Sequence, residues 1–297
     1  MYEPIPYQSP NIVKANGIEI CYDAFGYPRH PALLMVAGLG MQLIGWDEEI
    51  CRMLAERGFW VIRYDNRDVG QSTKFEDAGT PNPMNAFAGK AVAAPYLLSD
   101  MAADAIGLLD ALHVEKAHIL GASMGGMIAQ TVAIHYAERV RSLTSIMSTT
   151  GNIDVSTPTS EGLALLTSPP AKDLEDAIEK EIAWKKATNG SAYPVDEARA
   201  RERAKAIWER GIYPDGVARQ LTAILASGSR QEALKTLSTP TLVIHGQEDI
   251  IVPVAGGIAT AEAIPNAKLM LIYGLGHALP PETWPEVVDA IADIAKD

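Results

Sequence analysis

The sequence predicts an α/β fold with a mostly parallel, eight-stranded sheet that carries helices on both faces. Short apolar runs rich in Val, Ile and Leu alternate with longer amphipathic patterns, as in chains whose parallel strands are joined by helical crossovers. The alternation stops between residues 152 and 236, where the sequence is charged and helical in pattern. A length of 297 residues allows one large α/β domain or two smaller ones.

The chain begins with a predicted hairpin. Residues 11–24 contain two extended segments on either side of Asn16-Gly17, a dipeptide that favours the left-handed backbone of tight hairpin turns. The apolar runs that follow predict buried strands, and the amphipathic stretches between them predict helices. In chain order these elements are a strand at 31–37, a helix near 46–57, a strand at 59–65, a surface loop at 74–95, a helix at 99–112, a strand at 117–121, a helix from about residue 123 and a strand at 142–148.

A strand–helix–strand–helix unit is expected at the end of the chain. Its strands are the apolar runs TLVIHG and KLMLIYG, and its helices follow Pro253 and Pro281. Proline supports this reading because it is favoured at the first position of a helix.

These patterns predict how the chain is divided. We expect an α/β core made of residues 1–151 and 237–297. The segment 152–236, which contains Trp184 and Trp208 but no strand pattern, is expected to form a helical cap inserted into that core.

Charge and hydropathy exclude two kinds of partner. The net charge of −12 would repel the phosphate backbone of a nucleic acid, and no run of Lys and Arg offsets it. The longest candidate for a membrane span, Ala32 to Met41, is well short of the roughly 20 residues that a spanning helix needs. We therefore expect neither a nucleic-acid partner nor a membrane.

The cysteines and the N-terminal sequence indicate the compartment. Cys21 and Cys51 are too few for a disulfide framework and lack the CxxC spacing of a metal or redox site, so we expect two free thiols and no metal. The opening residues MYEPIPYQSP lack the positive charge and the apolar stretch of a signal peptide. The prediction is a cytoplasmic protein.

The sharpest local motif is Gly121-Ala122-Ser123-Met124-Gly125, a G-x-S-x-G between a predicted strand and a predicted helix. A serine on such a tight turn has a strained backbone, and the flanking glycines avoid steric clashes. The turn presents the hydroxyl at the carboxyl edge of the sheet, beside a helix N-terminus, where ligands bind in α/β folds. Ser123 is therefore the predicted nucleophile; the alternative is a small residue needed only for close helix packing.

A serine nucleophile needs a neighbouring base, and the sequence offers six histidines. His277 lies in a glycine-flanked loop directly after a predicted strand, so it also emerges at the carboxyl edge. His245 ends another strand and is the rival, although it is better suited to pack under the loop that follows. We predict His277 as the base. Four histidines are placed where they cannot reach the serine: His30, His113, His118 and His135.

The base in turn needs a carboxylate that accepts its second ring N–H. Asp249 follows the strand TLVIHG and precedes a proline-initiated helix, and it is the predicted acid. A helix-capping role is the alternative for Asp249. Glu248 is its nearest competitor, and Asp154, just after the strand at 142–148, is the second.

Acyl transfer also requires hydrogen-bond donors for a developing oxyanion. The backbone amide of Met124, one residue past the nucleophile, is the first candidate. The second is expected from the glycine-containing loop after the strand at 31–37, with the amide of Leu39 preferred and that of Gly38 in reserve. The alternative for this loop is an ordinary strand-to-helix turn.

The segment Asp65-Asn66-Arg67-Asp68 contains paired carboxylates that could serve acid–base chemistry. We expect a local salt-bridged turn there instead.

At these residues the chain resembles the α/β-hydrolase superfamily. The glycine loop, DNRDVGQS, GASMGG, HGQEDIIVP and GLGHALP occur in the family's order and cover both ends of the core. Within the superfamily, VIRYDNRDVGQST, GASMGGMIAQ and GLGHALP are similar to aclacinomycin methylesterases and related bacterial carboxylesterases. One departure is Ala37-Gly38, where many relatives carry His-Gly; only the side chain differs, so the backbone donors can be retained.

The resemblance implies a serine hydrolase that cleaves a carboxylic ester through an acyl-enzyme, without a cofactor. Methyl esters are one substrate class of such enzymes. The same triad could hydrolyse a C–C bond, a lactone or a thioester, or carry out cofactor-free perhydrolysis. A small-molecule receptor with slow turnover is the alternative from another class. A serine at position 123 argues against dehalogenases and epoxide hydrolases, which need a carboxylate nucleophile.

An apolar pocket is expected beside the catalytic loops and under the cap, so the predicted substrate is a small-molecule ester of apolar character. Each candidate lining residue could also belong to the core. The protein is expected to act as a monomer or a homodimer. The candidate pocket residues are Met41, Trp46, Trp184, Trp208 and Leu279.

Overall fold

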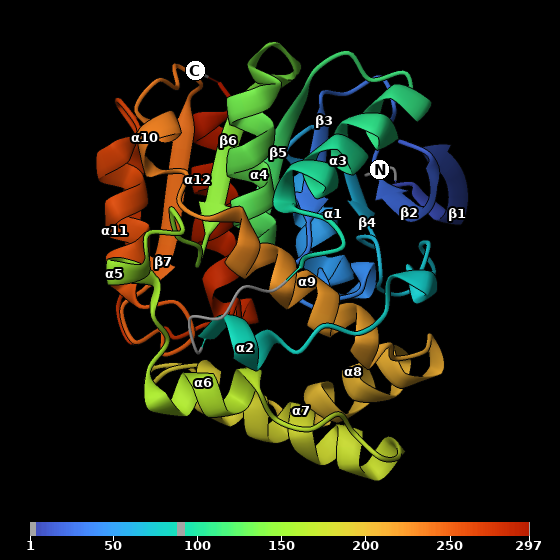
Figure 1. Ribbon diagram of the computed structural model, residues 1–297. Helices are drawn as coiled ribbons and strands as arrows, with labels where there is room; N and C mark the ends of the chain where they lie inside the picture. Colours follow the sequence, from blue (N-terminus) through green and yellow to red (C-terminus); the bar gives the residue numbers. More distant parts are fainter. Residues whose placement is uncertain (1–3, 88–92, 297) are drawn as a thin grey trace.

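The computed structural model describes residues 4–87 and 93–296 (Figure 1). In these residues, eight strands form one sheet in the order β1-β2-β4-β3-β5-β6-β7-β8. Strand β2 is antiparallel to β1 and β4, and all other neighbours are parallel. The predicted mostly parallel eight-stranded sheet is confirmed. The strands are β1 (Tyr7–Ala15), β2 (Ile18–Phe25), β3 (Ala32–Val36), β4 (Trp60–Tyr64), β5 (Ala117–Ala122), β6 (Val140–Ile146), β7 (Thr241–Gly246) and β8 (Lys268–Ile272).

Helices cover both faces of the sheet, as predicted (Figure 1). The buried side chains of α3, α4 and α11 join one core cluster, and those of α1 and α12 join the cluster on the opposite face. Strand β5 is buried along its whole length between them, as expected of a central parallel strand. The bounds are α1 (Glu48–Glu56), α3 (Leu98–Ala111), α4 (Met124–His135), α11 (Val254–Ala263) and α12 (Trp284–Ile294).

The first two strands form the predicted hairpin, which is longer than residues 11–24. Asn16 and Gly17 have φ values of +48° and +79°, the left-handed pair that a tight hairpin turn requires. Strand β1 already begins at Tyr7 and is exposed over most of its length. Because it is an exposed edge strand, its first residues show no apolar alternation, and the sequence pattern missed them.

The described part of the stretch 74–95 lies at the surface, as expected, but it is not all loop. It contains a short 3-10 helix, η2 (Glu76–Ala78), and helix α2 (Pro83–Phe87); residues 88–92 lie outside the described part of the chain. Helix α2 packs against α9 (Pro214–Ser227). This tertiary contact explains a helix that the polar, proline-containing sequence did not predict.

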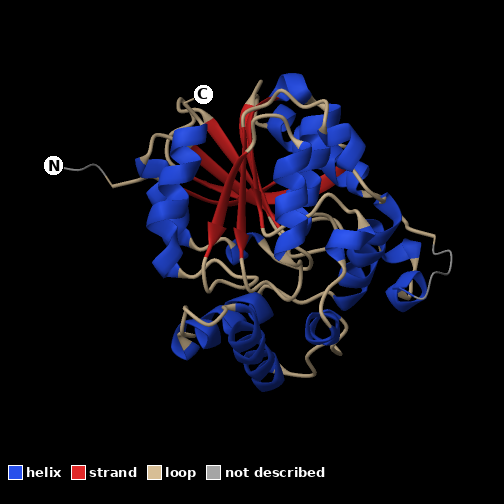
Figure 2. Cartoon of the chain, turned by 90° about the vertical axis from the view of Figure 1, so that its left-hand side faces the viewer, coloured by secondary structure: helices blue, strands red, loops and turns tan. Residues whose placement is uncertain are grey.

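The chain between β6 and β7 is fully described, and its regular elements are all helical. We call residues 152–236 the helical segment. Figure 2 shows helices of this segment grouped beyond the carboxyl ends of the strands, and α7 and α8 pack against each other. Besides α9, the segment contains α5 (Ile153–Ser156), α6 (Ser160–Leu166), α7 (Leu174–Thr188), α8 (Glu197–Glu209) and α10 (Gln231–Leu234).

Short 3-10 turns occupy other connections: η1 (Leu43–Gly45), η3 (Ala137–Arg139) and η4 (Pro281–Thr283). Both cysteines are buried and unpaired, which agrees with the prediction of free thiols. In the described part of the chain, none of the helices is long and apolar enough to cross a membrane.

Candidate active site

Ser123 joins β5 directly to α4 and has a left-handed backbone, with φ +57° and ψ −122°. A non-glycine residue in such a conformation costs about 1–3 kcal/mol and persists only where its surroundings fix it. The amide of Ser123 donates to Ile146 O at 2.9 Å, and Ser148 Oγ donates to Ser123 O at 2.8 Å. Strand β6 and the loop after it therefore hold the serine in this geometry.

The glycines of the motif are required by close backbone approaches. A Cβ on Gly121 would lie 2.0 Å from Gly125 O, and a Cβ on Gly125 would lie 2.0 Å from Val36 O. Either methyl group would force the backbone to move. Because α4 begins against the end of β3, the loop that follows β3 lies beside Ser123.

His277 connects Ser123 to Asp249. Its Nε2 lies 3.0 Å from Ser123 Oγ, and its Nδ1 lies 2.6 Å from Asp249 Oδ2. The first distance permits proton transfer from hydroxyl to imidazole, and the second fixes the ring with Nδ1–H directed at the carboxylate. The structure thus brings together the three residues that the sequence analysis selected.

Asp249 is held as an anion. Its Oδ1 accepts hydrogen bonds from Ile251 N and Val252 N, both at 2.8 Å. Burial alone would raise the pKa of Asp249, but the nearby charge of His277 and the hydrogen bonds from His245 and His277 lower it to about 2. The carboxylate is therefore ionised at neutral pH and can accept the imidazole N–H. The N-cap of α11 is Pro253 rather than Asp249.

His245, near the end of β7, packs against the loop that carries Asp249, as expected, and contacts the same carboxylate oxygen as His277. Its Nε2 lies 2.8 Å from Val252 O and 3.3 Å from Asp249 Oδ2. Since both of these oxygens are acceptors, the ring proton is assigned to Nε2. His245 thus supports the loop after β7, which carries Asp249.

The two rival acids lie elsewhere. Glu248 accepts hydrogen bonds from the amide and hydroxyl of Ser191, and Asp154 is exposed in the first turn of α5. Among the contacts of the described residues, neither carboxylate is bonded to His277.

Two free amides lie next to the serine. A Cβ on Gly38 would lie 4.0 Å from Ser123 Oγ, so the loop after β3 approaches the hydroxyl closely. Across the described residues, neither Leu39 N nor Met124 N has a hydrogen-bond partner. The amide of Met124 also lies at the N-terminus of α4, where the helix dipole favours negative charge.

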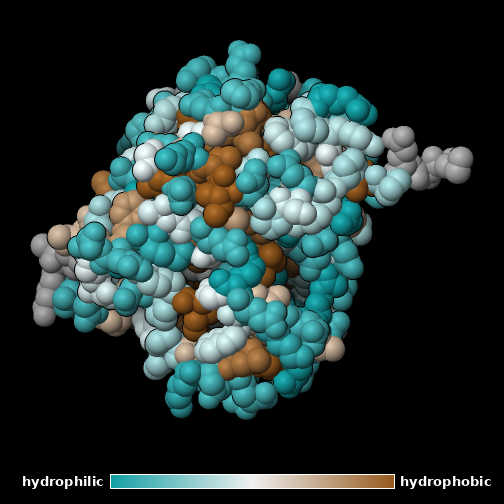
Figure 3. Space-filling view, turned by 90° about the vertical axis from the view of Figure 1, so that its right-hand side faces the viewer, coloured by the Kyte–Doolittle hydropathy of each residue, from teal (hydrophilic) through white to brown (hydrophobic). Residues whose placement is uncertain are grey.

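The five candidate pocket residues fall into two groups. Trp46 is 3% exposed and packs in the core cluster of α1 and α12, and Met41 and Leu279 are half-buried against that cluster. Trp184 of α7 and Trp208 of α8 are half-buried within the helical segment. Figure 3 shows apolar side chains in several separate groups on one side of the molecule, with hydrophilic side chains between them. Whether these residues line a pocket stays a prediction.

Two surface hollows lie away from Ser123. The hollows beside His113, Val114 and Glu115 lie near the start of β5, whereas Ser123 follows its end. Within residues 4–87 and 93–296, no three His, Cys, Asp or Glu side chains are grouped so that they could hold a metal ion.

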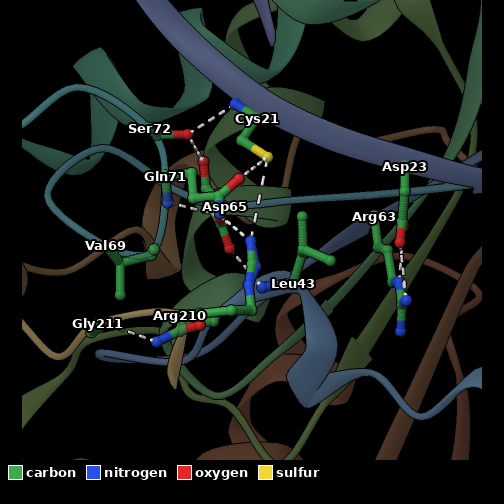
Figure 4. A network of polar contacts seen from close by, with 12 residues as sticks. Cys21, Asp23, Leu43, Arg63, Asp65, Val69, Gln71, Ser72, Arg210 and Gly211 are labelled. Atoms are coloured by element: carbon green, nitrogen blue, oxygen red, sulfur yellow. Dashed lines mark hydrogen bonds and ion pairs between the residues drawn. The ribbon is translucent and has the colours of Figure 1, made fainter. Parts of the chain in front are cut away.

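A local salt-bridged turn was the expectation for the segment 65–68. Its two aspartates do form ion pairs, but with arginines that are distant in the sequence. Asp65 Oδ2 lies 2.7 Å from Arg210 Nη2 at the end of α8, and Asp65 also accepts from Leu43 N (Figure 4). Asp68 forms a bidentate pair with Arg219 of α9, with N–O distances of 2.8 and 2.9 Å. These buried pairs join the core to the helical segment. No local sequence signal marked the two arginines, because their partners lie about 150 positions away.

A hydrogen-bonded Ser–His–Asp group at the carboxyl edge of an α/β sheet is typical of serine hydrolases. Comparison with known protein families agrees with this class. The model of one family, described as the alpha/beta hydrolase fold, matches residues 31–282. The chain therefore belongs to the alpha/beta hydrolase fold family, and the resemblance drawn from the motifs is confirmed.

Individual relatives cover nearly the whole chain. The chain is 27% identical over 289 residues to rhodomycin D methylesterase DauP of Streptomyces sp. (strain C5), which spans 91% of this chain and 92% of the relative. It is 26% identical over 281 residues to 3-oxoadipate enol-lactonase 2 of Acinetobacter baylyi, spanning 93% and 94%. A solved structure of the meta-cleavage product hydrolase from Pseudomonas fluorescens IP01 gives a TM-score of 0.75 at 22% identity, covering 96% of this chain and 97% of that chain. This last likeness shows the shared fold.

Proposed function

We propose that this hydrolase is a carboxylesterase that cleaves a small-molecule carboxylic ester through an acyl-enzyme on Ser123. The observation that carries the proposal is the hydrogen-bonded chain from Ser123 Oγ through His277 to the ionised Asp249. The strained backbone of Ser123 adds support, because strain of this kind concentrates at functional sites.

Each residue has a defined role in this reaction. Ser123 Oγ attacks the ester carbonyl carbon while its proton passes to His277 Nε2, and Asp249 stabilises the resulting imidazolium. The amides of Leu39 and Met124, with Gly38 in reserve, donate to the oxyanion. His277 then protonates the departing alcohol, deprotonates an attacking water, and finally returns a proton to Ser123 as the carboxylic acid leaves.

We further propose that the helical segment acts as a cap over this site. Gly276 N donates to Asn189 O, just after α7, at 3.2 Å, so the segment touches the loop that carries His277. On the other side of Ser123, a Cβ on Gly40 would lie 2.9 Å from Val217 of α9. A segment in contact with both catalytic loops is suited to bound the substrate pocket and exclude water.

The similarity to a rhodomycin D methylesterase favours a methyl ester as substrate. A lactone is the second candidate, because the similarity to an enol-lactonase extends over nearly the whole chain. A lactone is a cyclic ester and follows the same steps, except that the alcohol stays attached to the acyl-enzyme. A cytoplasmic location and a monomeric or homodimeric state remain predictions.

Hydrolysis should be measured for p-nitrophenyl esters of graded acyl length, methyl esters of bulky aromatic acids, and lactones. We expect turnover of at least one ester class, and Ser123→Ala should reduce its kcat by about 10⁴-fold or more. Binding of these compounds without turnover above that of Ser123→Ala would favour the receptor alternative. Turnover of C–C bond, thioester or peracid-forming substrates alone would reassign the reaction while keeping the triad.

A further inference from the structure

Three hydrogen bonds fix residues 37–41 of the loop after β3. Asn66 Nδ2 donates to Ala37 O at 3.0 Å, and Met41 N donates to Gly38 O at 3.2 Å, closing a tight turn. The third bond runs from Gly40 N to Gln220 Oε1 at 2.8 Å. The first two bonds come from the core, whereas the third comes from α9 in the helical segment.

Gln220 is fully buried and uses both ends of its amide. Its Oε1 accepts from Gly40 N, and its Nε2 donates to Arg67 O at 2.8 Å. Because one partner is a donor and the other an acceptor, only one orientation of the side-chain amide satisfies both. Gln220 therefore bridges the loop after β3 to the segment after β4.

Helix α9 also fixes Gly40 by contact and is itself firmly anchored. Val217, three residues before Gln220 on the same helix face, lies against Gly40, which has a φ of +65°. The buried bidentate pair between Arg219 and Asp68 fixes α9 to the core. The position of Gly40 is thus set by an element more than 170 residues later in the sequence.

We propose that Gln220 is a positioning residue for the oxyanion donors: by holding Gly40 it orients the turn that carries the proposed donor amide, Leu39 N. The inference rests on the proposed function of Ser123. Oxyanion donors act mainly in the transition state and only when they are preorganised. Loss of the Gln220 bridge should therefore lower kcat much more than it raises KM.

The test compares two buried glutamines with p-nitrophenyl acetate as substrate. Gln220→Met removes the bridge with little change in side-chain volume. Gln130→Met is the matched control, because Gln130 of α4 is also fully buried and uses both ends of its amide outside the loop after β3: its Nε2 donates to Ser145 Oγ at 3.2 Å, and its Oε1 accepts from Arg230 Nε at 3.1 Å. We expect Gln220→Met to lower kcat by about 10- to 100-fold with KM changed less than about threefold. Gln130→Met should lower Tm by a similar amount and keep kcat within about threefold.

A second variant keeps the proposal testable if Gln220→Met does not fold. In Gln220→Glu the introduced carboxyl is buried, and burial favours its neutral form. When neutral, this carboxyl can accept from Gly40 N and donate to Arg67 O; when ionised, it repels Arg67 O. The ratio of variant to wild-type kcat should therefore rise as pH falls from about 8 to about 6.

Equal losses of kcat in the two methionine variants, an increase in KM alone, or a pH-independent ratio for Gln220→Glu would overturn the positioning role. Acylation of wild-type Ser123 is measured first. If the wild-type serine is not acylated, the proposed function fails and the inference with it. If it is acylated and the Gln220 variants keep their kcat, only the inference fails.

Discussion

Ser123, His277 and Asp249 could be selected from the sequence because each lies just past a predicted strand. Side chains at the carboxyl ends of parallel strands meet at one edge of the sheet. Their positions after the predicted strands were therefore enough to infer that they lie close together. Gln220 and Arg219 carried no such signal. They lie within a helix, and their partners in the core are distant in sequence, so only the folded chain reveals their contacts.

Asp249→Asn tests the role of the carboxylate. The variant keeps the shape of the side chain but cannot stabilise the imidazolium, and an amide N–H facing His277 favours the wrong ring tautomer. We expect kcat for an ester substrate to fall by about 10³- to 10⁴-fold with little change in KM. Steady-state kinetics on the folded variant provides the measurement. A loss of less than about tenfold would point to another acid, with Glu248→Gln and Asp154→Asn as the variants to compare.

At the scale of elements, the strands and helices of the core follow from apolar periodicity and turn residues. The exceptions have physical causes. The start of β1 lacks a pattern because the strand is an exposed edge, and α2 is stabilised by α9 rather than by its own sequence. The ion pairs between the segment 65–68 and α8–α9 could not be predicted, because the sequence shows charged residues but not which of them are buried together.

Two arginines of the helical segment allow a buried ion pair to be compared with a surface ion pair. Arg210 pairs with Asp65, whose side chain is 0% exposed, whereas Arg199 pairs at the surface with Asp47 and Glu49. Arg210→Met leaves a buried carboxylate without its cation and should lower the free energy of unfolding by about 3 kcal/mol. Arg199→Met should cost about 0–1 kcal/mol.

Urea unfolding of the two variants at neutral pH measures this difference. Similar small losses in both would show that the Asp65–Arg210 pair contributes no more than a surface contact.

At the scale of the whole molecule, the site contributes to the dependence of stability on pH. The pKa of Asp249 is lowered from its ordinary value of 3.8 to about 2 in the folded protein, so the unfolded chain binds the proton more readily. The resulting stabilisation is fully present above about pH 4 and is lost as pH falls through about 2. It amounts to roughly 2 kcal/mol.

Urea titrations of wild type and Asp249→Asn between about pH 5 and pH 2 should show this effect. The stability difference between the two proteins is expected to shrink as pH falls. A difference that stays constant over this range would mean that Asp249 has an ordinary pKa in the folded state.

The proposed reaction depends on Ser123 being a nucleophile that its neighbours activate. Labelling with a fluorophosphonate, followed by digestion and mass spectrometry, tests this most directly because the reagent reacts covalently with activated serines. We expect one label per chain, on the peptide that contains Ser123, and no label on Ser123→Ala. A folded wild-type protein that remains unlabelled, or that carries its label on another residue, would contradict the proposed reaction.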